Sequence, residues 1–395
     1  MVRDMSLPYG SHELTQAYAL LRAGNDARAR VVCRDILKRE PNQPDALRLL
    51  ARLSTQTGMY GEAVSLLRRA CVAGATDADL HCQLGQALMS AGRDQEAIWV
   101  LTSARRGRAE HPPTTKLLAT LLHRSGQIDD ARRLLGDAVF GLGVAAGALD
   151  LLEHWRGLMP DDPVPQHRLA PLRGEEPPER AADGYVTYLF DHYADFFDAS
   201  LAKLNYRAPA VIAQQLRQSA VLATGQWQVL DAGCGTGLCA VIARPFAAHL
   251  TGVDLSAAMV AKAVERGGYD TLVLAEITQH LNRCPERFDL ILSADTLIYF
   301  GELSTVLTAA SYALRPGGWL AFTLERSDDD DLTANGYRLN GSGRYSHTTA
   351  CITRALTAAD LRLRAMNRVV LREEDGKPVP GWVVLAQRCA RGETV

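Results

Sequence analysis

The chain has 395 residues, more than one ordinary hydrophobic core needs, so its length predicts two domains. Its composition, 47% hydrophobic and 22% charged, is typical of a soluble globular protein, and its net charge of −2 gives no general attraction to nucleic acid or to an anionic membrane. No apolar run reaches the roughly 18 residues of a membrane span, the N-terminal residues lack the apolar stretch of a secretory signal, and the eight cysteines include no C-x-x-C pair. We therefore expect a cytoplasmic protein with reduced thiols, and no zinc site, membrane segment or nucleic-acid partner.

The first third of the chain repeats itself every 34 residues. Four columns of mostly small residues keep this step over four copies: Gly24, Gly58, Gly92 and Gly126; Ala29, Ala63, Ala97 and Ala131; Ala17, Ala51, Gly85 and Ala119; and Ile36, Ala70, Ala104 and Ala138. Two packed helices joined by a tight turn need small side chains at their contact and glycine where the turn takes a positive φ. The period therefore predicts stacked helical hairpins.

This pattern resembles the tetratricopeptide repeat over residues 10–145, with Pro41 at the family's proline position and Ala75 and Ala109 replacing it in later copies. The resemblance implies a curved solenoid whose concave face holds a peptide or another protein, and a scaffold or dimerisation element with an empty groove is an equally open alternative. An apolar side along 146–160 predicts a closing helix, so we place the repeat domain at 10–160. Residues 161–182, rich in proline and charge, predict an extended linker without a core.

From residue 183 onward, apolar runs alternate with helical stretches. The runs that we expect to be buried strands are 227–232, 249–254, 271–276, 288–294 and 319–324, and helical stretches fall at 239–247, 257–266 and 302–314. This alternation predicts a parallel sheet with helices on both faces, which binds its ligand at the carboxyl ends of the strands. The expected fold class is an N-terminal α-solenoid followed by an α/β, Rossmann-like domain over 183–395.

A loop of alternating glycines, Gly233, Gly235 and Gly237, follows the first predicted strand, in which Asp231 is the acidic residue. Glycines at these positions let a ligand approach the backbone without a β-carbon in the way. The dinucleotide fingerprint G-x-G-x-x-G would need glycine at residue 238, which is leucine, and the chain contains no P-loop. Asp254 ends the next predicted strand, and its carboxylate can accept hydrogen bonds from both hydroxyls of a ribose.

The D-x-G-x-G-x-G turn, the GVDLS stretch at 252–256 and the LRPGG stretch at 314–318 resemble class I S-adenosylmethionine-dependent methyltransferases. The resemblance implies S-adenosylmethionine as the cofactor. The binding residues that it implies are Asp231, Gly233, Gly235 and Gly237 at the amino-acid portion and ribose, Asp254 and Leu255 at the ribose, Glu276 and Ile277 at the adenine, and Ala294 on the methyl-transfer side. Asp295 and Tyr299 follow Ala294 on that side.

Two further stretches flank the predicted sheet. Seven aromatic residues crowd residues 185–206, and we expect a helical lid over 183–209 whose Tyr185, Tyr193 and Phe197 face the pocket, where a ring attracts a sulfonium cation by about 0.5–2 kcal/mol. The FDxYAxxFD stretch at 190–198 and the GRYxH stretch at 343–347 resemble those of bacterial methyltransferases that contain tetratricopeptide repeats. That resemblance spans nearly the whole chain.

Candidate catalytic residues follow from the chemistry of methyl transfer. Near-attack positioning supplies about 7–11 kcal/mol and a general base only about 3–5 kcal/mol. An O–H or N–H acceptor would use a base, for which His347, Tyr299 and His192 are the candidates, whereas Arg344 can pair with an acceptor carboxylate to give an ester. The GSGRYSH stretch at 341–347 is expected on a loop, where His347 is as readily a hydrogen-bonded loop residue. The four aspartates at 328–331 are expected in a solvated loop and not in a metal site.

We predict an enzyme that transfers the sulfonium methyl group in line to an oxygen or nitrogen nucleophile. The acceptor would be a peptide, a protein or a carrier-presented group, docked with help from the repeats. Two alternatives stay open: a methyltransferase of a free small molecule that uses its repeats to oligomerise, for instance as a homodimer, and a scaffold protein with a vestigial methyltransferase domain. The intact Asp231, the three glycines and Asp254 favour an enzyme.

Overall fold

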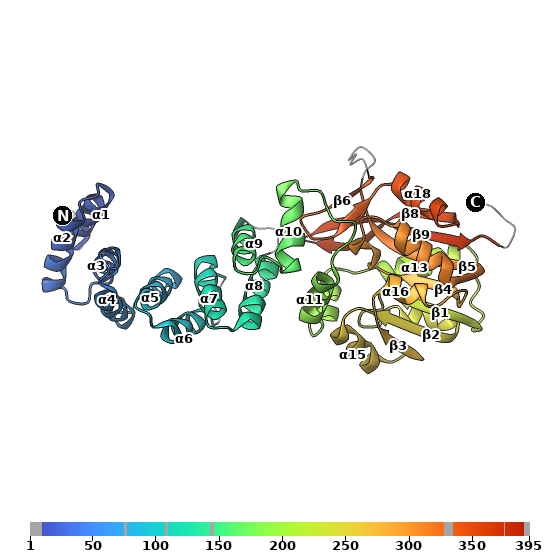
Figure 1. The fold of residues 1–395 in the computed structure, drawn as a ribbon, viewed down its shortest axis with the longest axis horizontal. Coiled ribbons are helices and arrows are strands. Elements are labelled where there is room, and N and C mark those ends of the chain that lie inside the picture. The colour runs from blue at the N-terminus through green and yellow to red at the C-terminus, as the bar shows by residue number, and fades with distance from the viewer. Residues whose placement is uncertain are drawn as a thin grey trace, which may run out of the picture. The chain divides into compact units, whose positions relative to one another are not determined.

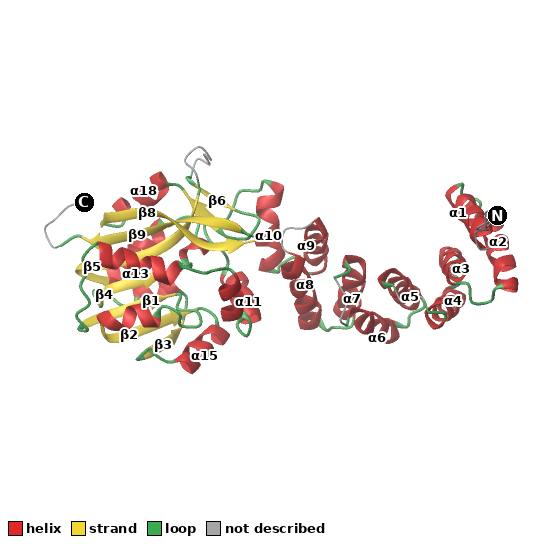
Figure 2. Ribbon diagram, turned by 180° about the vertical axis from the view of Figure 1, so that it is seen from behind, coloured by secondary structure: helices red, strands yellow, loops and turns green. Residues whose placement is uncertain are grey.

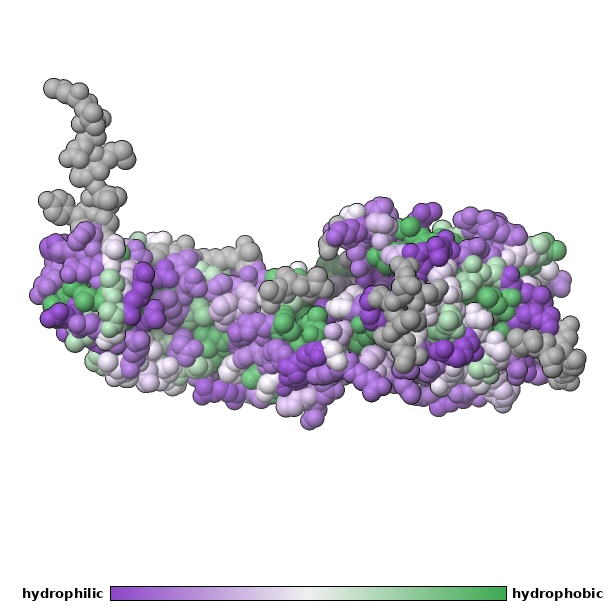
Figure 3. All heavy atoms as spheres, turned by 90° about the horizontal axis from the view of Figure 1, so that it is seen from above, coloured by the Kyte–Doolittle hydropathy of each residue, from purple (hydrophilic) through white to green (hydrophobic). Residues whose placement is uncertain are grey.

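The computed structural model describes residues 10–74, 77–106, 110–142, 146–327, 335–374 and 376–390. The chain divides into two compact units, Met1–Pro160 and Asp161–Val395, which we call the repeat unit and the α/β unit (Figure 1). Hydrophilic side chains cover most of the face drawn in Figure 3, with smaller apolar patches between them. Within the described ranges, no helix is long and apolar enough to cross a membrane. The aspartates at 328–331 lie outside the described residues.

The repeat unit consists of helical hairpins, with two helices for each copy of the repeat (Figure 1). Its helices are α1 (Gly10–Arg22), α2 (Asp26–Arg39), α3 (Pro44–Gln56), α4 (Tyr60–Val72), α5 (Ala78–Ser90), α6 (Asp94–Arg105), α7 (Pro112–Arg124), α8 (Ile128–Leu142) and α9 (Ala146–Leu158). The glycine column lies in the turns within the hairpins and has φ values of +72° to +76°, at Gly24, Gly58, Gly92 and Gly126. The prediction that these turns need a positive φ is confirmed.

Small residues lie where the helices of the repeat unit touch. The alanine column is fully buried, at Ala29, Ala63, Ala97 and Ala131. A β-carbon on Gly85 would lie 2.7 Å from Cδ2 of Leu101, so helices α5 and α6 pack more closely than an alanine at this position would allow. Helix α9 buries Leu151 and Trp155 against the preceding hairpin.

Helix α10 (Pro163–Arg173) occupies part of the segment that we expected to be an extended linker. Asp162 caps this helix, because its Oδ1 accepts a hydrogen bond from the Val164 amide at 3.0 Å. Pro163 stands at the start of the helix, where its missing N–H costs nothing, and the helix buries Val164, His167 and Leu169. The linker prediction is therefore wrong for residues 163–173, where proline starts a helix and does not interrupt one.

The described residues of the α/β unit form a nine-stranded sheet, drawn in yellow in Figure 2. Its main path runs in the order β3 (Thr271–Leu274), β2 (Ala247–Asp254), β1 (Trp227–Ala232), β4 (Phe288–Ser293), β5 (Leu314–Arg326), β7 (Tyr345–His347) and β6 (Tyr337–Leu339). Strand β9 (Lys377–Arg388) pairs antiparallel with β5, and β8 (Leu361–Glu374) pairs antiparallel with β9. Strands β1 to β5 are parallel and contain or overlap the five predicted apolar runs, whereas no strand was predicted at β6 to β9.

The strand order reverses between β1 and β4, and this reversal positions the site. Because crossover connections are right-handed, α14 (Ala240–Ala243) and α15 (Ala257–Arg266) lie on one face of the sheet, and α17 (Ser304–Ala313) lies on the other. The remaining helices are α11 (Asp183–Tyr193), α12 (Phe197–Lys203), α13 (Ala208–Gln218), α16 (Ile277–Asn282) and α18 (Thr349–Ala358), with the 3-10 turns η1 (Arg244–Phe246) and η2 (Leu297–Tyr299). A core of β1, β4, β5 and β9 against α13 fixes the carboxyl ends of the strands, where α/β sheets bind ligands.

Candidate active site

The loop after β1 takes a backbone conformation that only glycine adopts readily. Gly233, Gly235 and Gly237 have φ values of +80°, +53° and +90°. A β-carbon on Gly233 would collide with the Thr296 side chain, and one on Gly237 would lie 3.1 Å from the Tyr269 ring. The loop therefore passes close to its neighbours. Because its three glycines have no side chains, its backbone stays open to a ligand.

Asp231 is fully buried near the end of β1, beside this loop. Its Oδ2 accepts a hydrogen bond from the Tyr269 hydroxyl at 2.6 Å, whereas Oδ1 has no partner among the described residues. Burial raises the pKa of Asp231 to about 7, which the Tyr269 hydrogen bond partly offsets. A buried carboxylate oxygen without a donor fits a ligand that carries a positively charged N–H group.

Asp254, at the end of β2, ties the glycine loop to the neighbouring strand. Its Oδ2 accepts from the Gly235 amide at 2.8 Å and its Oδ1 accepts from the Ser256 amide at 2.9 Å. Burial raises the pKa of Asp254, and these backbone donors act against that rise. Leu255 is half-buried beside it. Each carboxylate oxygen keeps a second lone pair, so this side chain can also accept ligand hydroxyls.

Glu276 follows β3 and caps helix α16. Its Oε2 accepts from the Gln279 amide at 2.8 Å and its Oε1 accepts from the Thr278 hydroxyl at 2.9 Å. Both carboxylate oxygens thus have protein donors, and the adenine contact that we expected for Glu276 stays a prediction. Ile277 is buried next to it, and Ala294 is half-buried just beyond β4.

Helices α11 and α12 are fastened to the glycine loop and to the start of α15 by two carboxylates. Asp191 Oδ1 accepts from the Ser256 hydroxyl at 2.5 Å, next to Asp254. Asp198 accepts from the Thr236 hydroxyl at 2.6 Å, between two loop glycines, and pairs with Arg266. The polar positions of the FDxYAxxFD stretch therefore attach these helices to the segments that carry the glycines and Asp254.

The aromatic residues of this segment divide between the loop and the packing behind it. Phe197 lies 4.0 Å from where a Gly235 β-carbon would be, and Phe190 meets the Phe197 and Tyr299 rings edge to face, at 5.9 and 5.5 Å between centroids. Tyr185 differs from the expectation. It is buried, its ring lies 4.2 Å from the His167 ring, and its hydroxyl stands against Gly343, so it packs on α10 and not on the glycine loop.

His192 and Tyr193 remain on α11 among aromatic neighbours. The His192 ring lies 5.8 Å from the rings of both Tyr188 and Tyr193, and His192 and Tyr193 are half-buried. Their roles as base and cofactor contact stay predictions.

The GRYSH stretch is not a loop along its whole length. Tyr345–His347 form strand β7, which pairs with β5 and β6, so the loop prediction is wrong for these residues. His347 is fully buried; its Nε2 donates to the Gly301 carbonyl at 3.0 Å, and burial lowers its pKa to about 4. A general base must reach the proton that it takes. His347 instead holds the backbone at Gly301, which is a structural role.

Tyr299 and Arg344 lie near each other at the carboxyl end of the sheet. Burial raises the pKa of Tyr299 above its ordinary value, so its hydroxyl stays protonated and can donate a hydrogen bond. Arg344 Nε donates to Glu325 Oε1 at 2.7 Å, and its Nη2 pairs with Glu374. The guanidinium that we expected to meet an acceptor carboxylate therefore already has two carboxylate partners.

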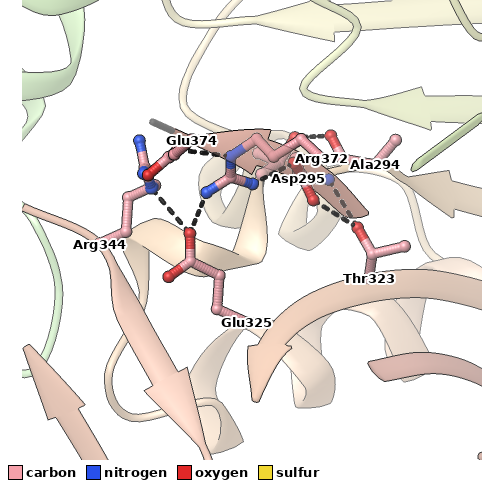
Figure 4. A network of polar contacts seen from close by, with 8 residues as sticks. Ala294, Asp295, Thr323, Glu325, Arg344, Arg372 and Glu374 are labelled. Atoms are coloured by element: carbon pink, nitrogen blue, oxygen red, sulfur yellow. Dashed lines mark hydrogen bonds and ion pairs between the residues drawn. The ribbon is translucent and has the colours of Figure 1, made fainter. Parts of the chain in front are cut away.

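Five charged side chains gather at this place (Figure 4). Arg372 is buried at the end of β8; its Nη1 donates to Asp295 Oδ2 at 2.8 Å, its Nε donates to Glu374 Oε1 at 2.7 Å, and its Nη2 pairs with Glu325. We call this group the five-charge cluster, formed by Asp295, Glu325, Arg344, Arg372 and Glu374. The sequence pointed to Asp295 and Arg344 only, because the other three become neighbours through the β5–β9–β8 pairing.

Asp295 holds a strained backbone within the cluster. Its φ is +51°, a conformation that costs a non-glycine residue about 1–2 kcal/mol. The Thr323 hydroxyl receives a hydrogen bond from the Asp295 amide at 2.8 Å, and Arg372 holds the carboxylate, so the conformation is fixed from both sides. Strain of this kind, maintained by surrounding contacts, is typical of functional sites.

Comparison with known proteins agrees with this arrangement. Residues 230–322 match the family described as a methyltransferase domain, and residues 14–53 match the tetratricopeptide repeat. The malonyl-[acyl-carrier protein] O-methyltransferase of Pseudescherichia vulneris is 30% identical over 206 residues, covering 51% of this chain and 67% of that protein. Human methyltransferase-like protein 27 is 32% identical over 170 residues, covering 41% of this chain and 69% of that protein.

Among solved structures, the Burkholderia thailandensis 1,6-didemethyltoxoflavin-N1-methyltransferase is similar, with a TM-score of 0.42 and 21% identity over 54% of this chain and 93% of that one. The two sequence relatives are matched over two thirds or more of their own length. The chain therefore belongs to the class I S-adenosylmethionine-dependent methyltransferases and is an enzyme that uses this cofactor, with tetratricopeptide repeats preceding the methyltransferase domain.

Proposed function

We propose that this enzyme transfers the methyl group in line to an oxygen or nitrogen nucleophile of an acceptor that is a peptide, a protein or a carrier-presented group. The observation that carries the proposal is the buried Asp231 oxygen, which has no donor among the described residues. It lies beside a loop of three positive-φ glycines to which Asp198 of α12 is bonded. The acceptor would approach past Ala294, towards the five-charge cluster.

We assign the cofactor contacts to residues of this chain as follows. Asp231 would bind the ammonium group, the glycine loop would pass along the amino-acid portion, Asp254 and Leu255 would hold the ribose, and Ile277 would pack on the adenine beside Glu276. When bound, S-adenosylmethionine supplies an electrophilic methyl group on a sulfonium, which leaves as a neutral thioether. Tyr193 and Phe197 would cover the site and exclude water. Positioning by these residues would supply most of the rate acceleration.

The kind of acceptor is supported by two observations. A tetratricopeptide repeat is a protein-interaction module, and one relative is named for methylation of a group on an acyl-carrier protein. Both favour an acceptor that offers a surface beyond the reacting atom. The repeat unit would then raise the time that the acceptor spends at the α/β unit.

The cofactor site is tested by titration calorimetry with S-adenosylmethionine and S-adenosylhomocysteine. We expect Asp254→Ala and Asp231→Asn each to lose about 1.5–3 kcal/mol of binding free energy, or about 10- to 150-fold in Kd, because each removes a charged hydrogen-bond acceptor. The control is Glu265→Gln, an exposed carboxylate on α15 that should bind like the wild type. Absence of binding by the wild type, or unchanged binding by Asp254→Ala, would contradict the proposal.

Docking by the repeats is tested with a protease site inserted at the Pro160–Asp161 boundary of the full chain. The full chain is folded first and then cleaved, and the two units are separated. Methyl transfer is assayed with two extracts of the expressing cells, namely the dialysed macromolecular fraction and the small-molecule dialysate. We expect transfer to the macromolecular fraction, and loss of most of it after the repeat unit is removed. Equal kcat/KM before and after removal would refute docking, and transfer to the dialysate alone would favour a free small molecule.

A further inference from the structure

The five-charge cluster carries one more carboxylate than guanidinium groups: Asp295, Glu325 and Glu374 against Arg344 and Arg372. Both guanidinium groups are already occupied, since Arg372 contacts all three carboxylates and Arg344 contacts two. An acceptor carboxylate added here would bring a second unbalanced negative charge into a buried site, which is costly at low dielectric. The cluster is therefore suited to a cation, and the ester-forming pairing expected for Arg344 is disfavoured.

Glu325 has an oxygen available for such a cation. Both guanidinium groups contact its Oε1, so Oε2 takes no part in the ion pairs among the five described residues of the cluster. Glu325 is buried, near the end of β5. Its second oxygen can accept a hydrogen bond from a ligand without breaking the contacts to Arg344 and Arg372.

Two buried hydroxyl groups that have no hydrogen-bond partner in the described part of the chain lie on the same face of the sheet as Glu325. Ser346 is the register partner of Glu325 in the parallel β5–β7 pair, and paired residues project to the same side. Ser327 follows Glu325 by two residues, and its amide donates to the His347 carbonyl, which continues the ladder, so alternation puts its side chain on that side too. Within the described residues, neither Oγ has a partner, although both side chains are more than nine-tenths buried.

Orphaned buried hydroxyl groups of this kind indicate a ligand, because native proteins rarely leave them unpaired. Three acceptor oxygens, Glu325 Oε2 and the Oγ atoms of Ser327 and Ser346, thus lie on one face beside a cluster with one more carboxylate than guanidinium groups. The exposed Arg338, the register partner of Ser346 in β6, projects to the same face. A primary ammonium group has three N–H donors and one positive charge, which matches this set.

We propose that Glu325, Ser327 and Ser346 bind a primary ammonium group of the methyl acceptor. This inference rests on the proposed function, since it names the acceptor's chemical class as an amine. A primary ammonium group has an ordinary pKa of about 10.4 and is charged at neutral pH. Its positive charge would balance the one excess carboxylate of the cluster.

The test uses the full chain saturated with S-adenosylhomocysteine and three probes of one length: n-hexylamine, hexanoate and n-hexanol. We expect hexylamine to bind about tenfold more tightly than either of the others in calorimetric titrations. Glu325→Gln should abolish that preference. Ser346→Ala leaves every ion pair of the cluster in place and should weaken hexylamine binding about fivefold. Glu265→Gln is the matched control and should bind hexylamine like the wild type.

Each other outcome overturns the inference. Hexanoate binding as tightly as hexylamine would show that the site does not select a cation, and hexylamine binding no better than hexanol would show that the site does not recognise the ammonium charge. Hexylamine affinity unchanged in both variants would place the amine elsewhere. Normal affinity for S-adenosylhomocysteine shows that a variant is folded. If the wild type fails to bind S-adenosylhomocysteine, the proposed function fails, and the same titrations on the cofactor-free chain still decide the amine site.

Discussion

Asp231 shows how one residue couples cofactor binding to pH. Its carboxylate is enclosed near the end of β1 with a single hydroxyl donor, and burial raises its pKa to about 7. In the folded protein without ligand this group therefore keeps its proton over a pH range in which an exposed aspartate has lost it. A ligand ammonium would restore the charged form, so the burial that raises the pKa of Asp231 also prepares this carboxylate to bind a cation.

The stability of the cofactor-free enzyme should reflect this proton. The unfolded chain releases the Asp231 proton at about pH 4, and the folded chain releases it at about pH 7. Between these values the folded state binds more protons than the unfolded state. The unfolding free energy therefore falls as the pH rises through this window and then levels off. Asp231→Asn removes this contribution and should flatten the profile. Urea unfolding of both proteins at a series of pH values measures the difference, and parallel profiles would show that Asp231 does not titrate in this window.

At the scale of elements, helices α11 and α12 depend on carboxylates for their attachment. Asp191 reaches the start of α15 and Asp198 reaches Thr236 within the glycine loop, from two consecutive helices. The same segments carry Asp254 and the loop glycines, so a ligand that orders the loop also orders the surface on which these helices rest. If α11 and α12 form the predicted lid, their attachment and cofactor binding should stabilise each other.

Asp198→Asn should weaken this coupling. The variant loses its charge-assisted bond with Arg266 and weakens the one with Thr236, and we expect S-adenosylhomocysteine affinity to fall about 5- to 30-fold, or about 1–2 kcal/mol. Amide exchange over 183–203 should slow on ligand addition in the wild type and less so in the variant. The control is Asp195→Asn, which loses only an exposed pair with Lys262. Equal protection in Asp198→Asn and the wild type would argue against a coupled lid.

The elements also show what sequence patterns can reveal. Strands β1 to β5 were predictable because each is a continuous apolar run followed by a turn, and the repeat helices because their period is long and regular. Strand β8 was not, since much of it is only half-buried and its residues show no simple alternation. Because β8 was not predicted, Arg372 was not recognised as a site residue. Its contact with Asp295 spans 77 positions and leaves no local sequence pattern. Helix α10 was missed because prolines at a helix start look like those of a linker.

At the scale of the whole molecule, the two units have separate cores and different sources of stability. The repeat unit relies on contacts between neighbouring helices, such as Gly85 on Leu101, whereas the α/β unit has one sheet and a ligand site. A ligand stabilises only the cooperative unit that binds it. The two units should therefore respond independently to a ligand and to a packing defect.

Calorimetric unfolding can separate these responses. Saturating S-adenosylhomocysteine at about 100 times its Kd should stabilise the α/β unit by about 2.7 kcal/mol and leave the other transition in place. Gly85→Leu forces a side chain into Leu101, so it should lower the unfolding temperature of the repeat unit and leave that of the α/β unit unchanged. A single transition that shifts in both experiments would show that the units unfold as one.

The connection between the units is short, because α9 ends at Leu158 and α10, part of the α/β unit, begins at Pro163. If the repeat unit docks the acceptor as proposed, the length of this tether sets the effective concentration of the acceptor at the second binding step, and that concentration falls once the tether outgrows the span that it bridges. Lengthening it with glycine and serine would therefore tune turnover by avidity alone, with every contact of the acceptor unchanged.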